Sequence, residues 1–161
     1  MTFVTVGNAT DGFRRLLGAV DTLADGAEQT PIVIQSGNNP GFVSPHAVVR
    51  AFMPMEEFED HVRRARLVIS HAGAGTVLNA MAARKVPVVM PRRAKYGELV
   101  DDHQAELVEY LASASRVIPA WEPADLPDAV RTALSRASEP SPRPADDLVR
   151  VVSACLEEVL A

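Results

Sequence analysis

Cysteine is almost absent from this sequence of 161 residues, with Cys155 as its single instance. One cysteine cannot form a disulfide within the chain, so we exclude a disulfide-held fold and expect a reducing, cytoplasmic setting. No apolar run approaches the roughly 20 residues that a membrane-spanning helix needs. The N-terminus lacks a basic segment followed by a long apolar one, so no signal peptide is predicted. Any contact with a membrane is therefore expected to be peripheral or through a partner.

Basic residues are fewer than acidic residues in this sequence. Sixteen Lys and Arg residues face 21 Asp and Glu residues, which gives a formal net charge of -5. Nucleic-acid binding needs a basic face, so no nucleic-acid partner is expected. The hydrophobic fraction of 47% and the charged fraction of 23% are ordinary for a globular protein. The length fits one domain.

Short β-rich runs alternate along the chain with segments of helical periodicity. Apolar side chains in the first helical segment follow the spacing of one helix face: Phe13, Leu16, Leu17, Val20 and Leu23. Strands are predicted at 2–6, 31–35, 48–52, 67–70, 87–90 and 116–118, and helices at 11–24, 55–64, 75–84, 99–111 and 125–135. This alternation predicts an α/β fold, a Rossmann-like parallel sheet sandwiched by helices.

The predicted domain covers residues 1–137. Three prolines at 138–144 predict a stiff connector. Residues 145–161 then predict a last helix with one apolar stripe: Leu148, Val151, Val152, Cys155, Leu156 and Val159. That helix must pack either on this domain or on a partner.

A glycine-rich turn at 70–76, SHAGAGT, separates a predicted buried strand from a helix. Glycines let a ligand approach the backbone, and the helix N-terminus offers N–H groups, so the turn predicts a phosphate or diphosphate site. His71 and Thr76 add side-chain donors. The alternative is a tight turn with Thr76 as the helix cap. The turn lacks the third glycine of the dinucleotide fingerprint, and neither a Walker A loop nor a G-x-S-x-G elbow is present.

A second polar loop, residues 91–104 (PRRAKYGELVDDHQ), follows a later strand. Its cations Arg92, Arg93 and Lys95 are expected to meet an anionic group. The alternative is a solvated loop that leads into a helix N-terminus, where Asp101 and Asp102 suit the helix dipole. No metal site is predicted, because adjacent side chains diverge on a helix and no second cluster of ligands exists.

A third loop follows the first strand at residues 7–11. Thr10 or Asp11 is expected to cap the next helix. Gly7 and Asn8 either belong to this turn or face a ligand cleft, because ligands of open α/β sheets bind at the carboxyl ends of the strands.

Together these loops resemble the C-terminal, nucleotide-sugar-binding half of family-28 glycosyltransferases of the GT-B fold. The resemblance runs from about Phe3 to Val130 and is most specific over Val68–Gln104, in ISHAGAGT, KVPVVMPR and KYGELVDDHQ. VTVG after the first strand and IQSG after the second also fit. The sequence also resembles small one-domain catalytic subunits of bacterial exopolysaccharide and capsule transferases and of the eukaryotic dolichol-linked UDP-GlcNAc transferase.

The resemblance implies a role for each matching residue. His71, Gly73, Gly75 and Thr76 would hold the diphosphate. Gly7 and Asn8 would border the cleft, and Gln35 and Gly37 would line its floor. Phe52 and Met53 would contact the uracil, and Asn79 would contact the ribose. The donor sugar would be met by His103, Gln104 and Glu98. Asn79 stands where relatives commonly carry an acid.

The implied reaction is inverting transfer from a UDP-sugar (hexose, N-acetylhexosamine or uronic acid) to a lipid-linked glycan, in polysaccharide biosynthesis. It needs no metal or cofactor, because the helix N-terminus stabilises the leaving diphosphate. His71 is the candidate catalytic residue, although phosphate contact is its favoured task and the base can lie on another chain. A membrane-associated partner subunit would bind the acceptor, with residues 145–161 as the candidate docking helix. Homo-oligomerisation of the isolated chain stays open. The alternatives are a non-catalytic nucleotide-sugar-binding module and an unrelated phosphate-binding α/β enzyme.

Overall fold

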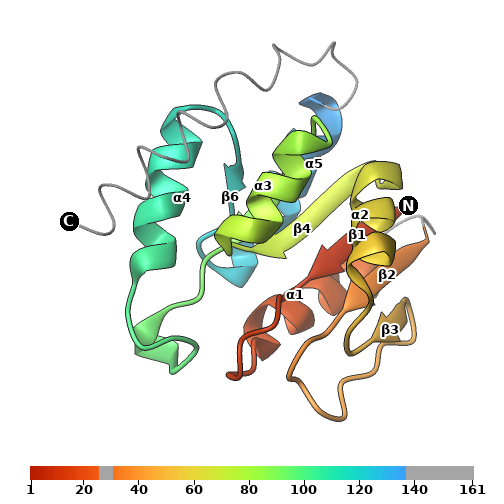
Figure 1. Cartoon of the computed structure of the whole chain (residues 1–161). Coiled ribbons are helices and arrows are strands. Elements are labelled where there is room, and N and C mark those ends of the chain that lie inside the picture. The colour runs from red at the N-terminus through yellow and green to blue at the C-terminus, as the bar shows by residue number, and fades with distance from the viewer. Residues whose placement is uncertain (26–30, 137–161) are drawn as a thin grey trace.

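Six short parallel strands form one sheet in the computed structural model, which describes residues 1–25 and 31–136. The strands are β1 (Thr2–Thr5), β2 (Ile32–Gln35), β3 (Val48–Arg50), β4 (Leu67–His71), β5 (Val88–Met90) and β6 (Ile118–Pro119). Their order across the sheet is β3-β2-β1-β4-β5-β6, and every neighbouring pair is parallel (Figure 1). The predicted connector at 138–144 and helix at 145–161 lie outside the described residues.

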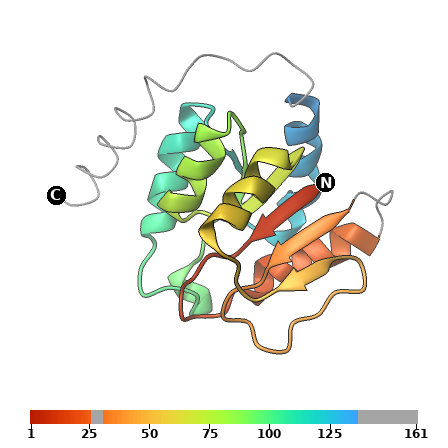
Figure 2. The same cartoon turned by 45° about the vertical axis from the view of Figure 1, so that its right-hand side comes forward.

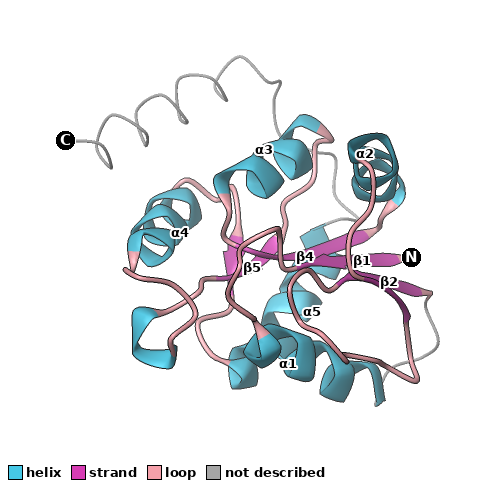
Figure 3. Cartoon of the chain, turned by 60° about the horizontal axis from the view of Figure 1, so that its bottom comes forward, coloured by secondary structure: helices cyan, strands magenta, loops and turns pink. Residues whose placement is uncertain are grey.

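Helices cover both faces of the sheet. Figure 3 shows α1 (Arg14–Asp25) and α5 (Leu126–Arg136) on one face, and α2 (Met55–Arg64), α3 (Ala74–Ala82) and α4 (His103–Ser113) on the other. Two short 3-10 helices, η1 (Ala94–Tyr96) and η2 (Pro123–Asp125), lie in the loops. This arrangement confirms the predicted parallel sheet sandwiched by helices. Within the described residues, no helix is both long and apolar enough to cross a membrane.

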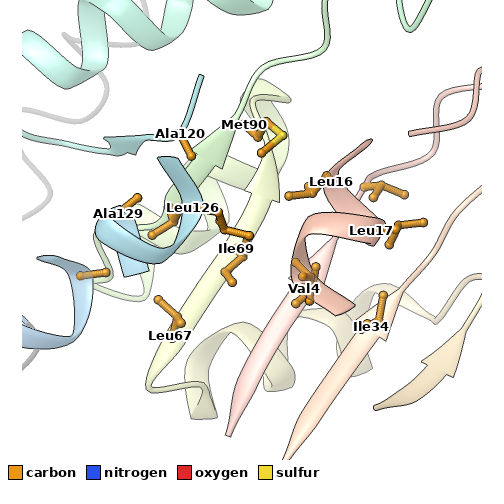
Figure 4. Close-up of a cluster of buried hydrophobic side chains, with 14 of the residues drawn as sticks. Val4, Leu16, Leu17, Ile34, Leu67, Ile69, Met90, Ala120, Leu126 and Ala129 are labelled. Atoms are coloured by element: carbon orange, nitrogen blue, oxygen red, sulfur yellow. The ribbon is translucent and has the colours of Figure 1, made fainter. Parts of the chain in front are cut away.

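The core lies on both sides of the sheet, because successive strand residues point to opposite faces. Val4 and Ile69 pack with Leu16 and Leu17 on the side of α1 and α5 (Figure 4). On the opposite side the packing forms two clusters: Phe3 and Val68 with Phe58 and Val62, and Val89 with Val77, Val108 and Leu111. The loops at the strand ends are therefore held by a sheet whose central strands β4 and β5 are buried on both faces.

Two helices begin later than the sequence predicts, and both corrections concern the loops of interest. Helix α1 begins at Arg14, so Thr10 and Asp11 are not its caps. The backbone N–H of Phe13 instead donates to Asn39 Oδ1 at 2.8 Å, which ties the end of this loop to the segment after β2. Helix α4 begins only at His103, because residues 91–102 first form η1 and a left-handed turn at Gly97 (φ 66°).

Candidate functional site

The carboxyl ends of the parallel strands lie at one edge of the sheet, where ligands of open α/β sheets bind. The loop after β1 lies there beside the loop after β5, as Figure 2 shows. Fourteen of the residues singled out in the sequence stand at these strand ends, in the loops that follow them or in the first turns of α3 and α4; Asn79 lies one turn further into α3. The topology thus gathers at one edge residues that are up to 97 positions apart in sequence, from Gly7 to Gln104.

The imidazole of His71 lies between two glycines. A Cβ atom at Gly7 would stand 2.4 Å from His71 Cε1, and one at Gly73 would stand 2.1 Å from His71 Nε2. Gly7 also has a φ of 73°, a conformation that L side chains rarely adopt. Both glycines are therefore required by the packing of His71 itself, before any ligand is considered.

His71 is neutral at physiological pH. Its residue is only 8% exposed, and Nδ1 has no hydrogen-bond partner among the described residues. Burial lowers the pKa of His71 from 6.5 to about 4, helped by the nearby charge of Arg92 and opposed by the backbone of Thr5. A general base works best with a pKa near the working pH. The environment of His71 therefore suits a hydrogen-bonding role better than proton abstraction.

The N-terminus of α3 presents free donors at this edge. Gly73 is the N-cap residue, and no side chain of the described residues caps the helix. The backbone N–H of Val77 donates to Gly73 O, whereas those of Ala74, Gly75 and Thr76 donate to nothing in the described part of the chain. Such N–H groups, together with the helix dipole, attract an anion. The alternative in which Thr76 caps the helix is wrong, because Thr76 lies within its first turn.

Gly75 differs from the other glycines of the turn. It is exposed, and no atom of the described residues lies within 4 Å of where its Cβ would stand. Nothing in the protein's own packing requires a glycine there. One turn further along α3, the side chain of Asn79 donates from Nδ2 to Gly75 O at 3.1 Å, which leaves Asn79 Oδ1 available as an acceptor.

Residues after β1 and β2 form a second group beside His71. Gln35 Nε2 donates to Asn8 Oδ1 at 3.3 Å, and the Oε1 atom of the buried Gln35 has no partner among the described residues. Gly37 has a φ of 54°, and a Cβ there would stand 2.5 Å from Gly7 O. The structure thus brings together the four residues that the sequence placed along the border and floor of the cleft.

The two residues predicted at the uracil site have different environments. Phe52 is 51% exposed and follows the carboxyl end of β3. Met53 is partly buried and packs against the cluster of Phe3, Phe58 and Val62. Phe52 is therefore available to stack on a base, and Met53 anchors the turn that presents it.

The predicted set of three cations does not exist as one ligand-facing group. Arg92 is only 1% exposed and points into the protein. Lys95 Nζ lies 3.0 Å from Glu122 Oε1, and Arg93 Nε lies 3.3 Å from Asp102 Oδ1. The prediction that Arg92, Arg93 and Lys95 jointly meet an anion is therefore wrong. Arg93, with a partly exposed side chain, stays a predicted contact.

Glu98 has a structural environment rather than the predicted place among the sugar contacts. It is 6% exposed, and its carboxylate accepts hydrogen bonds from Arg15 Nε at 3.0 Å and from a second Arg15 nitrogen at 2.9 Å. The backbone N–H of Arg93 also donates to it. A bidentate pair of this kind fixes geometry strongly. Arg15 was missed in the sequence because its partner lies 83 residues away.

The first residues of α4 complete the edge. Gln104 Oε1 accepts a hydrogen bond from the backbone N–H of Arg92 at 3.0 Å, which leaves the Nε2 donors of Gln104 free for a ligand. His103 is exposed, and the carboxylate of Asp101 raises its pKa. Within the described residues, no group of three or more His, Cys, Asp or Glu side chains could hold a metal ion.

Comparison with known proteins agrees with this geometry. The model of the glycosyltransferase family 28 C-terminal domain matches residues 1–151. The chain belongs to this family. Its sequence is also similar to the UDP-N-acetylglucosamine transferase subunit ALG13 of Yarrowia lipolytica, with 40% identity over 63 residues, which are 39% of this chain and 30% of that protein. The matched segment thus covers less than a third of the curated relative.

Solved glycosyltransferase structures share the fold of this family-28 domain. MurG of Acinetobacter baumannii matches 95% of the chain with 49% of its own length, at a TM-score of 0.59 and 19% identity. The calicheamicin glycosyltransferase CalG4 matches 99% of the chain with 39% of its own length, at a TM-score of 0.57 and 22% identity. The C-terminal CMP-Kdo binding domain of WaaA from Acinetobacter baumannii matches 99% of the chain with 89% of its own length, at a TM-score of 0.55 and 12% identity. The chain therefore has the fold of the C-terminal half of GT-B glycosyltransferases.

Proposed function

We propose that this chain is the donor-binding, catalytic subunit of an inverting glycosyltransferase that uses a UDP-sugar. The observation that carries the proposal is the uncapped N-terminus of α3, with the unobstructed Gly75 in its first turn and the neutral, buried His71 packed against Gly73, the N-cap residue. This arrangement offers hydrogen-bond donors and a positive helix end to a diphosphate. Membership of family 28 supports a nucleotide sugar as the ligand that contains this diphosphate.

In the proposed complex the diphosphate lies at the N–H groups of Ala74, Gly75 and Thr76. These donors stabilise the charge that develops on UDP as the acceptor hydroxyl attacks the anomeric carbon. A donor preorganised in this way is worth about 3 kcal/mol in the transition state. Because the backbone and the helix dipole neutralise the leaving group, the proposed reaction uses no metal ion and no cofactor.

The other parts of the donor reach neighbouring segments in this proposal. Phe52 and Asn79 face the uridine, and His103 and the free amide of Gln104 face the sugar. A hexose, an N-acetylhexosamine and a uronic acid all carry hydroxyl groups that these donors and acceptors can bind. The acceptor needs a general base, and the low pKa of His71 favours a base from another chain.

A partner subunit supplies the acceptor-binding half in this proposal. The chain corresponds to 49% of MurG and 39% of CalG4, so a complete GT-B enzyme would need a second half. ALG13 is likewise described as a subunit of a transferase. We propose a membrane-associated partner, a lipid-linked glycan acceptor and a role in polysaccharide biosynthesis, with this chain held at the cytoplasmic membrane surface by that partner. Residues 145–161 remain the candidate docking segment.

A non-catalytic nucleotide-sugar-binding module is the second candidate. It is favoured by one observation: the imidazole closest to the glycine turn, His71, titrates too low for an efficient general base. Such a module would bind UDP-sugars without transfer, even with the partner present.

Co-expression with a membrane-associated protein encoded next to this chain tests the proposal. Membranes with both proteins, with each one alone and with neither are incubated with UDP-glucose, UDP-GlcNAc or UDP-glucuronate, and bound UDP-sugar, released UDP and labelled lipid are measured. The proposal expects transfer only when both proteins are present. Binding without transfer under every condition would favour the non-catalytic module. Transfer by this chain alone would reject the partner requirement, and the lack of both binding and transfer would reject the function.

A further inference from the structure

Arg92 is the largest of the fully buried side chains in the described part of the chain. Its guanidinium donates to four backbone carbonyls. One nitrogen donates to Asp11 O at 2.9 Å, Gly12 O at 3.2 Å and Glu98 O at 3.1 Å, and the other donates to Val6 O at 3.1 Å. One side chain therefore joins the loop after β1 to the loop after β5, across 80 or more residues of sequence.

Backbone carbonyls supply all the hydrogen bonds of the Arg92 guanidinium, and no carboxylate bonds to it in the described part of the chain. The carboxylate of Glu98 binds Arg15, and only the carbonyl of Glu98 binds Arg92. The ring of Phe13 lies 4.8 Å from the Arg92 guanidinium carbon. A buried charge is costly, and a hydrophobic side chain of similar volume often stabilises a fold better. The planar fork of the guanidinium does what a hydrophobic side chain cannot, because it fixes several carbonyls in one geometry.

The two loops that Arg92 joins carry different parts of the candidate site. Val6 directly precedes Gly7, against which the ring of His71 packs. On the other side, the backbone N–H of Arg92 holds Gln104 Oε1. The diphosphate side and the sugar side of the edge are therefore connected through this one residue.

We propose that Arg92 is a positioning residue, which sets the separation between His71 on the diphosphate side and Gln104 on the sugar side. This inference rests on the proposed function. It has a specific consequence: a ligand that spans both sides depends on Arg92, whereas UDP, which reaches only the diphosphate side, depends on it less. A merely structural role would lower stability without separating the affinities of the two ligands.

Arg92→Lys is the main test. Lysine keeps the charge but cannot span four carbonyls with a planar fork. UDP, UDP-glucose, UDP-GlcNAc and UDP-glucuronate are titrated calorimetrically into folded protein, and the UDP-sugar that wild type binds most tightly is followed. Because misplacement by about 1 Å can cost up to a hundredfold, we expect about a tenfold loss for the UDP-sugar and less than about a threefold loss for UDP.

Two further variants make the test specific. Val20→Ala removes buried atoms from α1 away from the carboxyl edge, so it should destabilise the fold and leave both affinities within about twofold of wild type. Gln104→Ala should weaken the UDP-sugar, and adding Arg92→Lys to it should cost little more, because the proposed effect of Arg92 on the sugar acts through the side chain of Gln104.

If Arg92→Lys does not fold, Phe13→Leu replaces it, because this change removes the ring beside the guanidinium and keeps the charge. The same separation of affinities is expected, at a smaller size. Equal losses for UDP and UDP-sugar, no loss for either, or additive losses with Gln104→Ala would overturn the inference and leave the proposed function standing. Wild-type protein that binds neither ligand would overturn both.

Discussion

Gly73 and Gly75 stand two residues apart, and the packing of the protein requires a glycine only at position 73. Gly73 has φ -70° and ψ 127°, which any residue can adopt, so its backbone does not need a glycine. The space around Gly73 does need a glycine, because a Cβ atom at this position would stand 2.1 Å from His71 Nε2. Gly75 meets no atom of the described residues within 4 Å. At the scale of residues, Gly73 is thus required by the packing of His71, whereas Gly75 lies at an open surface.

Substitution by alanine should change the free energy of unfolding in opposite directions at the two positions. Gly73→Ala pushes against a buried ring and is expected to destabilise the fold by about 2 kcal/mol. Gly75→Ala places a better helix former in the first turn of α3 and should stabilise by up to about 1 kcal/mol. Urea unfolding of both variants and wild type, followed by circular dichroism, measures the two changes. A loss of similar size at both positions would contradict this account of the turn.

The buried imidazole of His71 predicts a pH dependence of stability. Its pKa is about 4 in the folded chain and 6.5 as the ordinary value, so the unfolded chain binds the proton more readily. The free energy of unfolding should therefore be highest above pH 6.5 and fall by about 3 kcal/mol as pH drops towards 4.

His71→Gln cannot titrate, so its stability should fall less than that of wild type over the same pH range. The exposed His103 acts in the opposite direction, since its raised pKa adds stability at low pH that is lost as pH rises. Its effect is present in both proteins and cancels in the difference. Parallel curves for wild type and His71→Gln between pH 6.5 and 4 would show that His71 is not buried in the neutral form.

At the scale of elements, the loop between β5 and α4 is held by an ion pair and not by its own hydrogen bonds alone. The side chains of Arg15 and Glu98 are 12% and 8% exposed and pair at 2.9 Å. Glu98→Gln would leave Arg15 in this position without its bidentate partner. Breaking a buried pair by removing one charge typically costs about 3 kcal/mol, and we expect a loss of about 2 to 3 kcal/mol here.

Asp60→Asn is the matched control, because Asp60 pairs with Arg63 and Arg64 on the exposed surface of α2. Exposed pairs of this kind contribute at most about 1 kcal/mol. Thermal unfolding compares the two variants, and amide hydrogen exchange should rise at 91–104 in Glu98→Gln only. Losses of the same size in both variants would mean that the Arg15–Glu98 pair does not hold this loop.

Apolar periodicity, which is a local signal, predicted the six strands and the five α-helices of the described residues, but not the short 3-10 helices η1 and η2. Met55–Arg64 has the predicted bounds, since it begins directly after Pro54 and the backbone becomes extended at Ala65. The start of α4 and the orientation of Arg92 were not predictable in this way. Both depend on contacts between residues 80 or more positions apart, such as Arg92 with Val6 and Arg15 with Glu98. A single sequence gives no signal for such pairs.

At the scale of the whole molecule, the sheet directs the loops of the candidate site to one edge, and an apolar side chain is exposed there. Val100, in the loop between β5 and α4, is 91% exposed. The chain has the length of one half of a GT-B enzyme such as MurG. In the proposed complex this edge faces the acceptor-binding partner, so Val100 is expected to be buried in that contact.

Val100→Asp should therefore weaken the partner interaction and leave UDP affinity unchanged. The control is Val48→Asp, because Val48 is also an exposed valine, at 59%, but stands on the edge strand β3. Pull-down of the membrane-associated partner by each variant measures the first effect, and calorimetry with UDP measures the second. Retention of the partner by Val100→Asp at wild-type level would place the interface elsewhere.

Calorimetric titration of UDP into wild type and Gly75→Val tests the central claim most directly. The open space at Gly75 means that valine should be tolerated by the fold, which circular dichroism verifies. If the diphosphate lies against Gly75, the branched side chain should weaken UDP by at least about 2 kcal/mol, roughly thirtyfold, comparable with the loss of a charge-assisted hydrogen bond. The account predicts binding by wild type and this loss in the folded variant. Equal UDP affinities, or no UDP binding by wild type, would contradict it.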